Sequence, residues 1–151
     1  MSGKIIDRIA EGIDAVEGAY EFFLAYAAQG ITDESEAGGI ASQLRSHLDS
    51  MAEAIGGLAP LVGSLLEEEN QVDSRDDLRA FVEVLESDTA KAGAVLSLIR
   101  SRASITSQLV DNLNASVHVR TLLTDLFILD EVLKLGVDEA TAPETSGSSA
   151  P

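Results

Sequence analysis

The segment from 117 to 135 has a regular spacing of apolar residues that strongly constrains its structure. Its main row repeats at alternating steps of three and four: Val119, Leu122, Leu126, Leu129 and Leu133. A second row accompanies it: Val117, Thr121, Ile128, Val132 and Leu135. Steps of three and four place residues on one side of an α-helix, and the second row, which flanks the first, widens the apolar arc. The segment is therefore predicted to be a helix with neighbours on more than one side.

Three further segments show helical spacing of apolar residues. The first extends from about Lys4 to Gln29. The second keeps its phase through Gly56, Gly57 and Pro60. Because proline lacks a backbone N–H and crowds the carbonyl four residues earlier, we expect Pro60 to kink the helix near Gly56. The alternative is a short break, with Pro60 starting a new helix. The apolar positions are Ile6, Ile9, Ile13, Val16, Tyr20, Phe23 and Ala27 in the first segment, Leu44, Leu48, Met51, Ile55, Leu58, Val62 and Leu65 in the second, and Leu78, Phe81, Leu85, Ala92, Val95 and Ile99 in the third.

Glycines followed by an apolar residue mark two predicted helix ends. Gly30 precedes Ile31, and Gly136 precedes Val137. Glycine adopts the left-handed conformation that commonly ends a helix, so we expect helices to stop at both positions. Thr32 is then expected to cap the second helix, because its hydroxyl can accept a hydrogen bond from a free N–H of the first turn.

The boundary between the third and fourth helices has two candidates. A break at 102–104 gives four helices of similar length and leaves Asn112 within the last one, and we favour it. A turn at 112–114 is the alternative, since Asp and Asn side chains compete for backbone hydrogen bonds. The fold class predicted is all-α: an antiparallel four-helix bundle over residues 1–138, with its second helix kinked at Pro60. Residues 139–151 are rich in Ser, Thr, Pro and Ala and are predicted to form a flexible, disordered tail.

Charge and composition exclude several classes of function. The chain of 151 residues has 26 acidic and 10 basic residues, a formal charge of −16, so the phosphates of a nucleic acid would repel it. It has no cysteine, which removes disulfides and thiolate metal sites. No window offers the roughly 18 uncharged apolar residues of a membrane span. Since Lys4, Asp7 and Arg8 interrupt the N-terminal segment, we expect no secretory signal and a cytoplasmic location.

The residues that usually carry chemistry in helical bundles are sparse. His47 and His118 are the two histidines, and neither has a carboxylate three or four residues away, so the sequence predicts no metal and no cofactor. Asp88, Asp125 and Asp130 are the acids nearest to apolar rows. Asp88 and its neighbour Thr89 interrupt the third row. We expect this polar step to face water, and the alternative is that it makes a buried polar contact.

Aromatic residues in unexpected positions indicate a surface that binds protein. Phe127 falls on a polar strip of the last helix with Arg120, Thr124 and Glu131. An exposed ring forgoes about 1.5–3 kcal/mol of burial, which suggests that another surface covers it. Phe22 and Tyr26 on the first helix also lie outside its main apolar row, so another surface is expected to cover them as well. These six residues form the predicted partner interface, and the alternative is that the rings belong to the core of a thicker bundle.

The sequence thus favours a non-catalytic protein-interaction module: a small acidic subunit, adaptor or assembly chaperone that presents an apolar helical surface to itself or to a partner protein. It contains no motif specific enough to indicate a family. The alternative is a bundle that binds a small apolar ligand or cofactor in room left by glycines. A second alternative is an enzyme subunit with a carboxylate site. The glycines concerned are Gly12, Gly18, Gly56, Gly57, Gly63 and Gly93.

Overall fold

The computed structural model describes residues 2–68 and 75–141, and within these ranges every regular element is helical. The prediction of an all-α fold is confirmed. The helix count differs, because the described residues form five α-helices and one short 3-10 helix instead of four helices. The elements are α1 (Ser2–Ala27), η1 (Glu34–Glu36), α2 (Gly39–Glu68), α3 (Arg75–Arg100), α4 (Ser107–Ala115) and α5 (Val117–Thr141).

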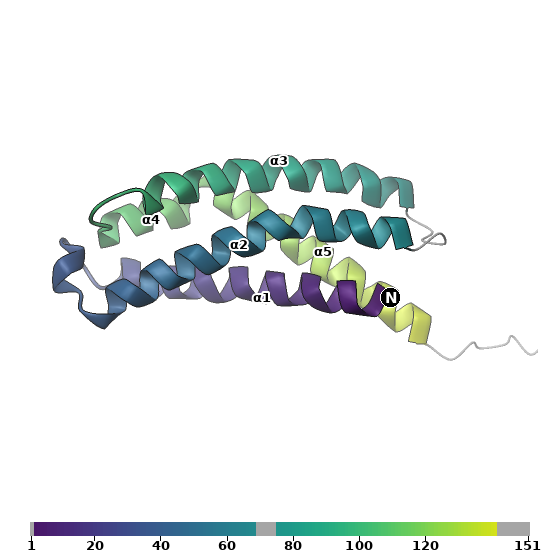
Figure 1. Ribbon diagram of the computed structural model, residues 1–151, viewed down its shortest axis with the longest axis horizontal. Coiled ribbons are helices and arrows are strands. Elements are labelled where there is room, and N and C mark those ends of the chain that lie inside the picture. Colours follow the sequence, from purple (N-terminus) through teal and green to yellow (C-terminus); the bar gives the residue numbers. More distant parts are fainter. Residues whose placement is uncertain (1, 69–74, 142–151) are drawn as a thin grey trace, which may run out of the picture.

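The helices form an elongated bundle (Figure 1). In that view α2 lies between α1 below it and α3 above it, and α4 and α5 lie behind these three helices. Consistent with this arrangement, α1 packs mainly on α2 and α4, and α3 packs on α2 and α5. The short α4 closes one end of the bundle, while the longer α5 crosses the back toward the other end.

The connection between α1 and α2 differs in part from the prediction. Gly30 has a φ of 66°, the left-handed value expected of a residue that ends a helix. Thr32 does not cap the second helix, however. Asp33 caps η1 by accepting from the N–H of Ser35 at 3.0 Å, and a second left-handed residue, Gly38 (φ 64°), precedes α2. The acidic cluster therefore forms its own turn before the long helix begins.

Helix α2 continues through Pro60 without interruption. Figure 1 shows its axis bending about half-way along, on the N-terminal side of Pro60, the side on which a proline ring crowds the preceding turn. All seven apolar positions of its row are buried, so the phase is kept across the bend. The preserved phase is the physical reason that this segment is a bent helix and not a loop.

The favoured boundary after α3 is a real break, while the alternative turn at 112–114 lies inside a helix. Residues 101–106 connect α3 to α4, which confirms the favoured break at 102–104. Asn112 is helical, but it belongs to a separate nine-residue helix that ends at Ala115, so the predicted single last helix is wrong. Ser116 interrupts the helix there, and its N–H bonds to the carbonyl of Leu113 at 3.1 Å.

The last helix also extends farther than predicted. Gly136 lies inside α5, which ends at Thr141, so the predicted stop at Gly136 is wrong. Unlike Gly30 and Gly38, it does not adopt a positive φ, and a glycine with helical angles costs stability without ending a helix. Residues 139–141, placed in the predicted tail, are helical, and 142–151 lie outside the described residues.

One hydrophobic core runs through the bundle and draws on all five α-helices. In α5, the first four members of the main row are buried and Leu133 is half-buried. The interruption in α3 is a buried polar position: Thr89 is buried and its hydroxyl donates to the carbonyl of Glu86 at 3.1 Å. The favoured prediction that this step faces water is wrong for Thr89.

Candidate functional site

Large apolar side chains collect on the outer side of α5. Nine large hydrophobic residues are exposed among the described residues, and five of them lie between 117 and 135. The other four are scattered over α1, α2 and α3. The concentration on one helix makes this face the most distinctive apolar surface of the described chain. The five are Val117, Phe127, Ile128, Val132 and Leu135, each between 49% and 66% exposed.

Helical geometry explains why these residues lie outside. Each residue advances about 100° around an α-helix, so positions two apart point about 200° from one another. Val117 precedes the buried Val119 by two positions, and Ile128 follows the buried Leu126 by two. The second apolar row thus lies almost opposite the core-facing row. The prediction that it flanks that row and packs against neighbouring helices is wrong.

Four of the six predicted interface residues share this outer surface. Arg120, Thr124, Phe127 and Glu131 are all exposed, and their spacing of four, three and four places them along one strip of α5. The prediction that Phe127 lies outside the core is confirmed, since 52% of its side chain is exposed. We call the described outer surface of α5, from 117 to 135, the α5 face.

Tyr26 is not available to a partner, so its prediction as an interface residue needs correction. Its side chain is 1% exposed, and its hydroxyl donates to the carbonyl of Ile105 at 2.7 Å. Burial, and then the nearby Glu34, raises the pKa of the phenol, which keeps its proton for this bond. Tyr26 is a core residue with a satisfied polar tip.

Phe22 is half-buried and packs within the bundle. Its ring stacks on the imidazole of His47 in α2, with centroids 4.5 Å apart and planes inclined by 23°. This contact joins α1, which carries Phe22, to α2, which carries His47. Phe22 therefore belongs to a different contact from the α5 face, and the structure does not place the six predicted residues in one patch.

The charges of the α5 face balance one another. It has two basic residues, Arg120 and Lys134, and two acidic ones, Asp130 and Glu131, apart from the buried Asp125. Lys134 pairs with Asp130 at 2.8 Å, four residues earlier. In a chain with a formal charge of −16, a locally neutral surface reduces the repulsion of an acidic partner.

At one end of the bundle, polar groups from two connections bond to each other. The hydroxyl of Ser107 donates to the carbonyl of Tyr26 at 2.7 Å and accepts from the N–H of Ile31 at 2.8 Å. The N–H of Ser107 donates to the carbonyl of Ile31 at 2.8 Å. Together with the bond from Tyr26 to Ile105, these contacts tie the end of α1 to the start of α4.

Glu34 and Arg45 extend this network. The guanidinium of Arg45 donates to both carboxylate oxygens of Glu34, at 3.1 and 2.9 Å, and to the carbonyls of Arg100 and Arg102, at 2.9 and 2.8 Å. The carboxylate of Glu34 also accepts from the N–H of Ile105 at 2.9 Å. We call the set comprising Tyr26, Ile31, Glu34, Arg45, Ile105 and Ser107 the loop network.

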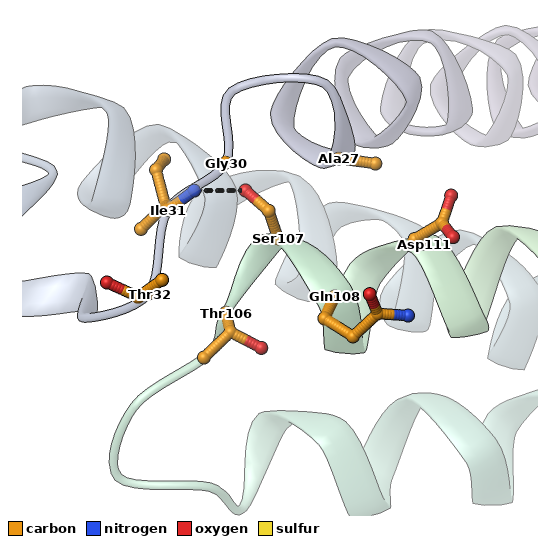
Figure 2. Close-up of a pocket in the computed structure, with 8 residues that line it drawn as sticks. All are labelled: Ala27, Gly30, Ile31, Thr32, Thr106, Ser107, Gln108 and Asp111. Carbon is orange, nitrogen blue, oxygen red and sulfur yellow. Dashed lines mark hydrogen bonds between the residues drawn. The ribbon is translucent and has the colours of Figure 1, made fainter.

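A hollow of about 470 Å³ lies beside the loop network (Figure 2). The N–H of Ile31 and the hydroxyl of Ser107 bond to each other at its wall, as Figure 2 shows, so neither is free for a ligand there. Asp111 is the charged residue of its lining. The hollow does not bring together a nucleophile and a base, and it lies away from the α5 face. Its lining comprises Ala27, Gly30, Ile31, Thr32, Thr106, Ser107, Gln108 and Asp111.

Asp88 and Asp125 form a carboxyl pair between α3 and α5. Asp125 is 9% exposed, and its Oδ2 has no hydrogen-bond partner. Burial raises the pKa of Asp125 to about 7, and the neighbouring carboxyl of Asp88 contributes to the rise. Neither residue lines the hollow beside the loop network, the hollow between Ile6 and Lys134, or the one between Asp33 and Ser104, so none of these three offers a substrate access to the pair. Asp130, the third acid singled out from the sequence, instead pairs with Lys134.

The glycine at position 12 leaves no room for a ligand between α1 and α2. A Cβ on Gly12 would meet Leu58 at 3.1 Å, so this glycine allows α1 and α2 to approach closely. Its space is filled by a leucine, not left for a cofactor. Elsewhere, a hollow of about 370 Å³ between α1 and α5 is lined by apolar and charged residues: Ile6, Asp7, Ile9, Ala10, Asp130, Leu133 and Lys134. Across the ranges 2–68 and 75–141, no group of three or more His, Asp or Glu side chains is placed to hold a metal ion.

Comparison of the chain with protein families, curated proteins and solved structures finds no match. None of the described helices combines the length and apolarity needed to cross a membrane.

Proposed function

We propose that the protein is a non-catalytic protein-interaction module whose binding surface is the α5 face. The concentration of five exposed large hydrophobic residues on one helix carries this proposal. Covering a half-exposed side chain of this size contributes about 1 kcal/mol, so a partner on this face gains from each of them. A large exposed apolar surface is typical of a protein-binding site.

The architecture of the bundle supports this role. The opposite side of α5 supplies buried residues to the core, so the helix is anchored independently of its outer side. The outer residues can then contact a partner without any change in fold. This division suits a small subunit, adaptor or assembly chaperone, in which a rigid helix presents an apolar strip to another protein.

Site-specific photo-crosslinking in the protein's own cells tests the proposal. A benzophenone amino acid replaces Ile128 on the α5 face in one variant and Val84 on α3 in the control. The two positions are matched, since they are 52% and 47% exposed. We expect discrete crosslinks to protein from position 128, and their loss when Val132→Asp is added. Equal crosslinking from both positions, or none from position 128, would overturn the proposal.

A further inference from the structure

The charges on the α5 face are arranged so that the face complements itself. Arg120 and Glu131 lie on the same strip, eleven positions apart. Eleven residues make about three turns, or about 16 Å, which is too far for an ion pair within one helix. Among the described residues, Arg120 takes part in no ion pair. A basic group at one end of the strip and an acidic group at the other match a second strip that runs in the opposite direction.

We propose that a second copy of this chain is the partner, and that it docks antiparallel on the α5 face about a two-fold axis between positions 125 and 126. Arg120 of each copy then pairs with the partner's Glu131. This inference rests on the proposed function, because it names the partner for the same surface. An interface of this kind uses the same patch on both copies, as two-fold dimers do.

The apolar residues fit the same register. Positions whose numbers add to about 251 lie opposite each other across such an axis. Val117 then faces the partner's Leu135, and Thr124 faces the partner's Phe127. A two-fold axis also brings equivalent flanks together, so the two Phe127 rings lie near the axis, at the centre of the interface. Aromatic residues at the centre with charges toward the rim are typical of protein interfaces.

The local charge favours a second copy on this helix over other exposed faces. The exposed side of α1 includes Asp7, Glu11, Asp14 and Glu21. Two such faces would repel each other, since like charges oppose across an interface. The α5 face carries equal numbers of basic and acidic residues, so two copies meet there without this penalty.

The size of the face predicts a reversible dimer. The segment from 117 to 135 is about 27 Å long, and a pair of such helices buries less surface than a stable dimer. We therefore expect a dissociation constant of about 10–100 µM. Sedimentation velocity at about 5 to 500 µM chain spans this range.

A charge exchange in the full chain tests the register. We expect Arg120→Glu and Glu131→Arg each to weaken the dimer about tenfold or more, because each creates like-charge contacts at two symmetric positions. The double variant should restore the dissociation constant to within about threefold of the original, since its charges are again complementary. Arg79→Glu on α3 is the matched control for Arg120→Glu, because it makes the same change of net charge at another exposed arginine. It should leave the dimer unchanged. Circular dichroism confirms that each variant is folded.

The outcomes separate this inference from the proposed function. A chain that stays monomeric at all concentrations overturns the dimer, while crosslinks from position 128 to a different protein would still support an interaction module. If Phe127→Asp abolishes the dimer but the double charge exchange does not recover the original dissociation constant, the α5 face is used in another register. That result would overturn the antiparallel pairing. A dimer insensitive to both changes would overturn the use of this face by a second copy.

Discussion

The loop network and the α5 face differ in whether their side chains find partners within the chain. In the loop network, the hydroxyl of Tyr26 and the carboxylate of Glu34 each bond to the connection between α3 and α4. On the α5 face, five large apolar side chains are between 49% and 66% exposed to solvent. The first region satisfies its own groups and needs nothing further, while the second leaves favourable burial unused. The difference suggests that the network serves the fold and the face serves a partner.

Shortening Tyr26 should have the largest effect on stability. Tyr26→Ala removes a fully buried ring and the bond to the Ile105 carbonyl, and we expect a loss of about 4 kcal/mol in the free energy of unfolding. Tyr26→Phe keeps the ring and should cost about 1 kcal/mol. Urea denaturation measures both. A loss below about 1 kcal/mol for Tyr26→Ala would show that the loop network is not part of the folding core.

Within the loop network, removing the Glu34 carboxylate should have the next largest effect. Glu34→Ala leaves Arg45 without its bidentate partner and Ile105 without an acceptor, and should cost about 2 kcal/mol. Glu36→Ala is the matched control, since Glu36 is an exposed residue of the same short helix, and should change the free energy of unfolding by less than about 0.5 kcal/mol. Equal effects in urea denaturation would contradict a specific role for Glu34.

Asp125 should make stability depend on pH. Its pKa is about 7 in the folded chain and near the ordinary 3.8 when unfolded, so the folded state holds the proton more tightly. This stabilisation is complete below about pH 4 and is lost as the pH rises to 7. Relative to Asp125→Asn, whose amide does not titrate, the natural chain should lose about 1.4 kcal/mol for each pH unit, or about 4 kcal/mol over that window.

Urea denaturation at several pH values checks this dependence. The curves of free energy against pH should diverge between pH 4 and 7 and run parallel above pH 7. Parallel curves throughout would mean that the pKa of Asp125 is not raised. Asp88→Asn provides the complementary variant, because it removes the neighbouring charge while Asp125 stays buried.

The sequence predicted those parts of the fold that depend on local periodicity. The buried row of α2, its passage through Pro60 and the stop at Gly30 all follow from spacing and backbone chemistry. Gly136 shows the limit of this reasoning, since the same Gly-Val pattern sits inside a helix. A local pattern cannot reveal whether the following residues continue the helix.

The candidate site could be predicted only in part, because exposure depends on which helices pack together. Phe127 was identified from its place on a polar strip, and it is exposed. Val117, Ile128, Val132 and Leu135 were assigned to neighbours that do not cover them, although their angle to the main row already indicates the outer side. The loop network gave no local signal, since its partners, such as Tyr26 and Ile105, are far apart in sequence.

The measurement that tests the central claim most directly combines association with stability in one pair of variants. Phe127→Asp with Ile128→Asp places charges on the α5 face, and Val84→Asp places one on α3 at matched exposure. We expect native mass spectrometry of gently purified protein, at about 100 µM chain, to show a complex, either a multiple of the chain mass or one that includes another chain. The α5 variant should appear as a bare monomer and the α3 variant as the complex, with the free energy of unfolding changed by less than about 0.5 kcal/mol in each. A complex that survives the α5 substitutions, or a fold that collapses because of them, would contradict the account.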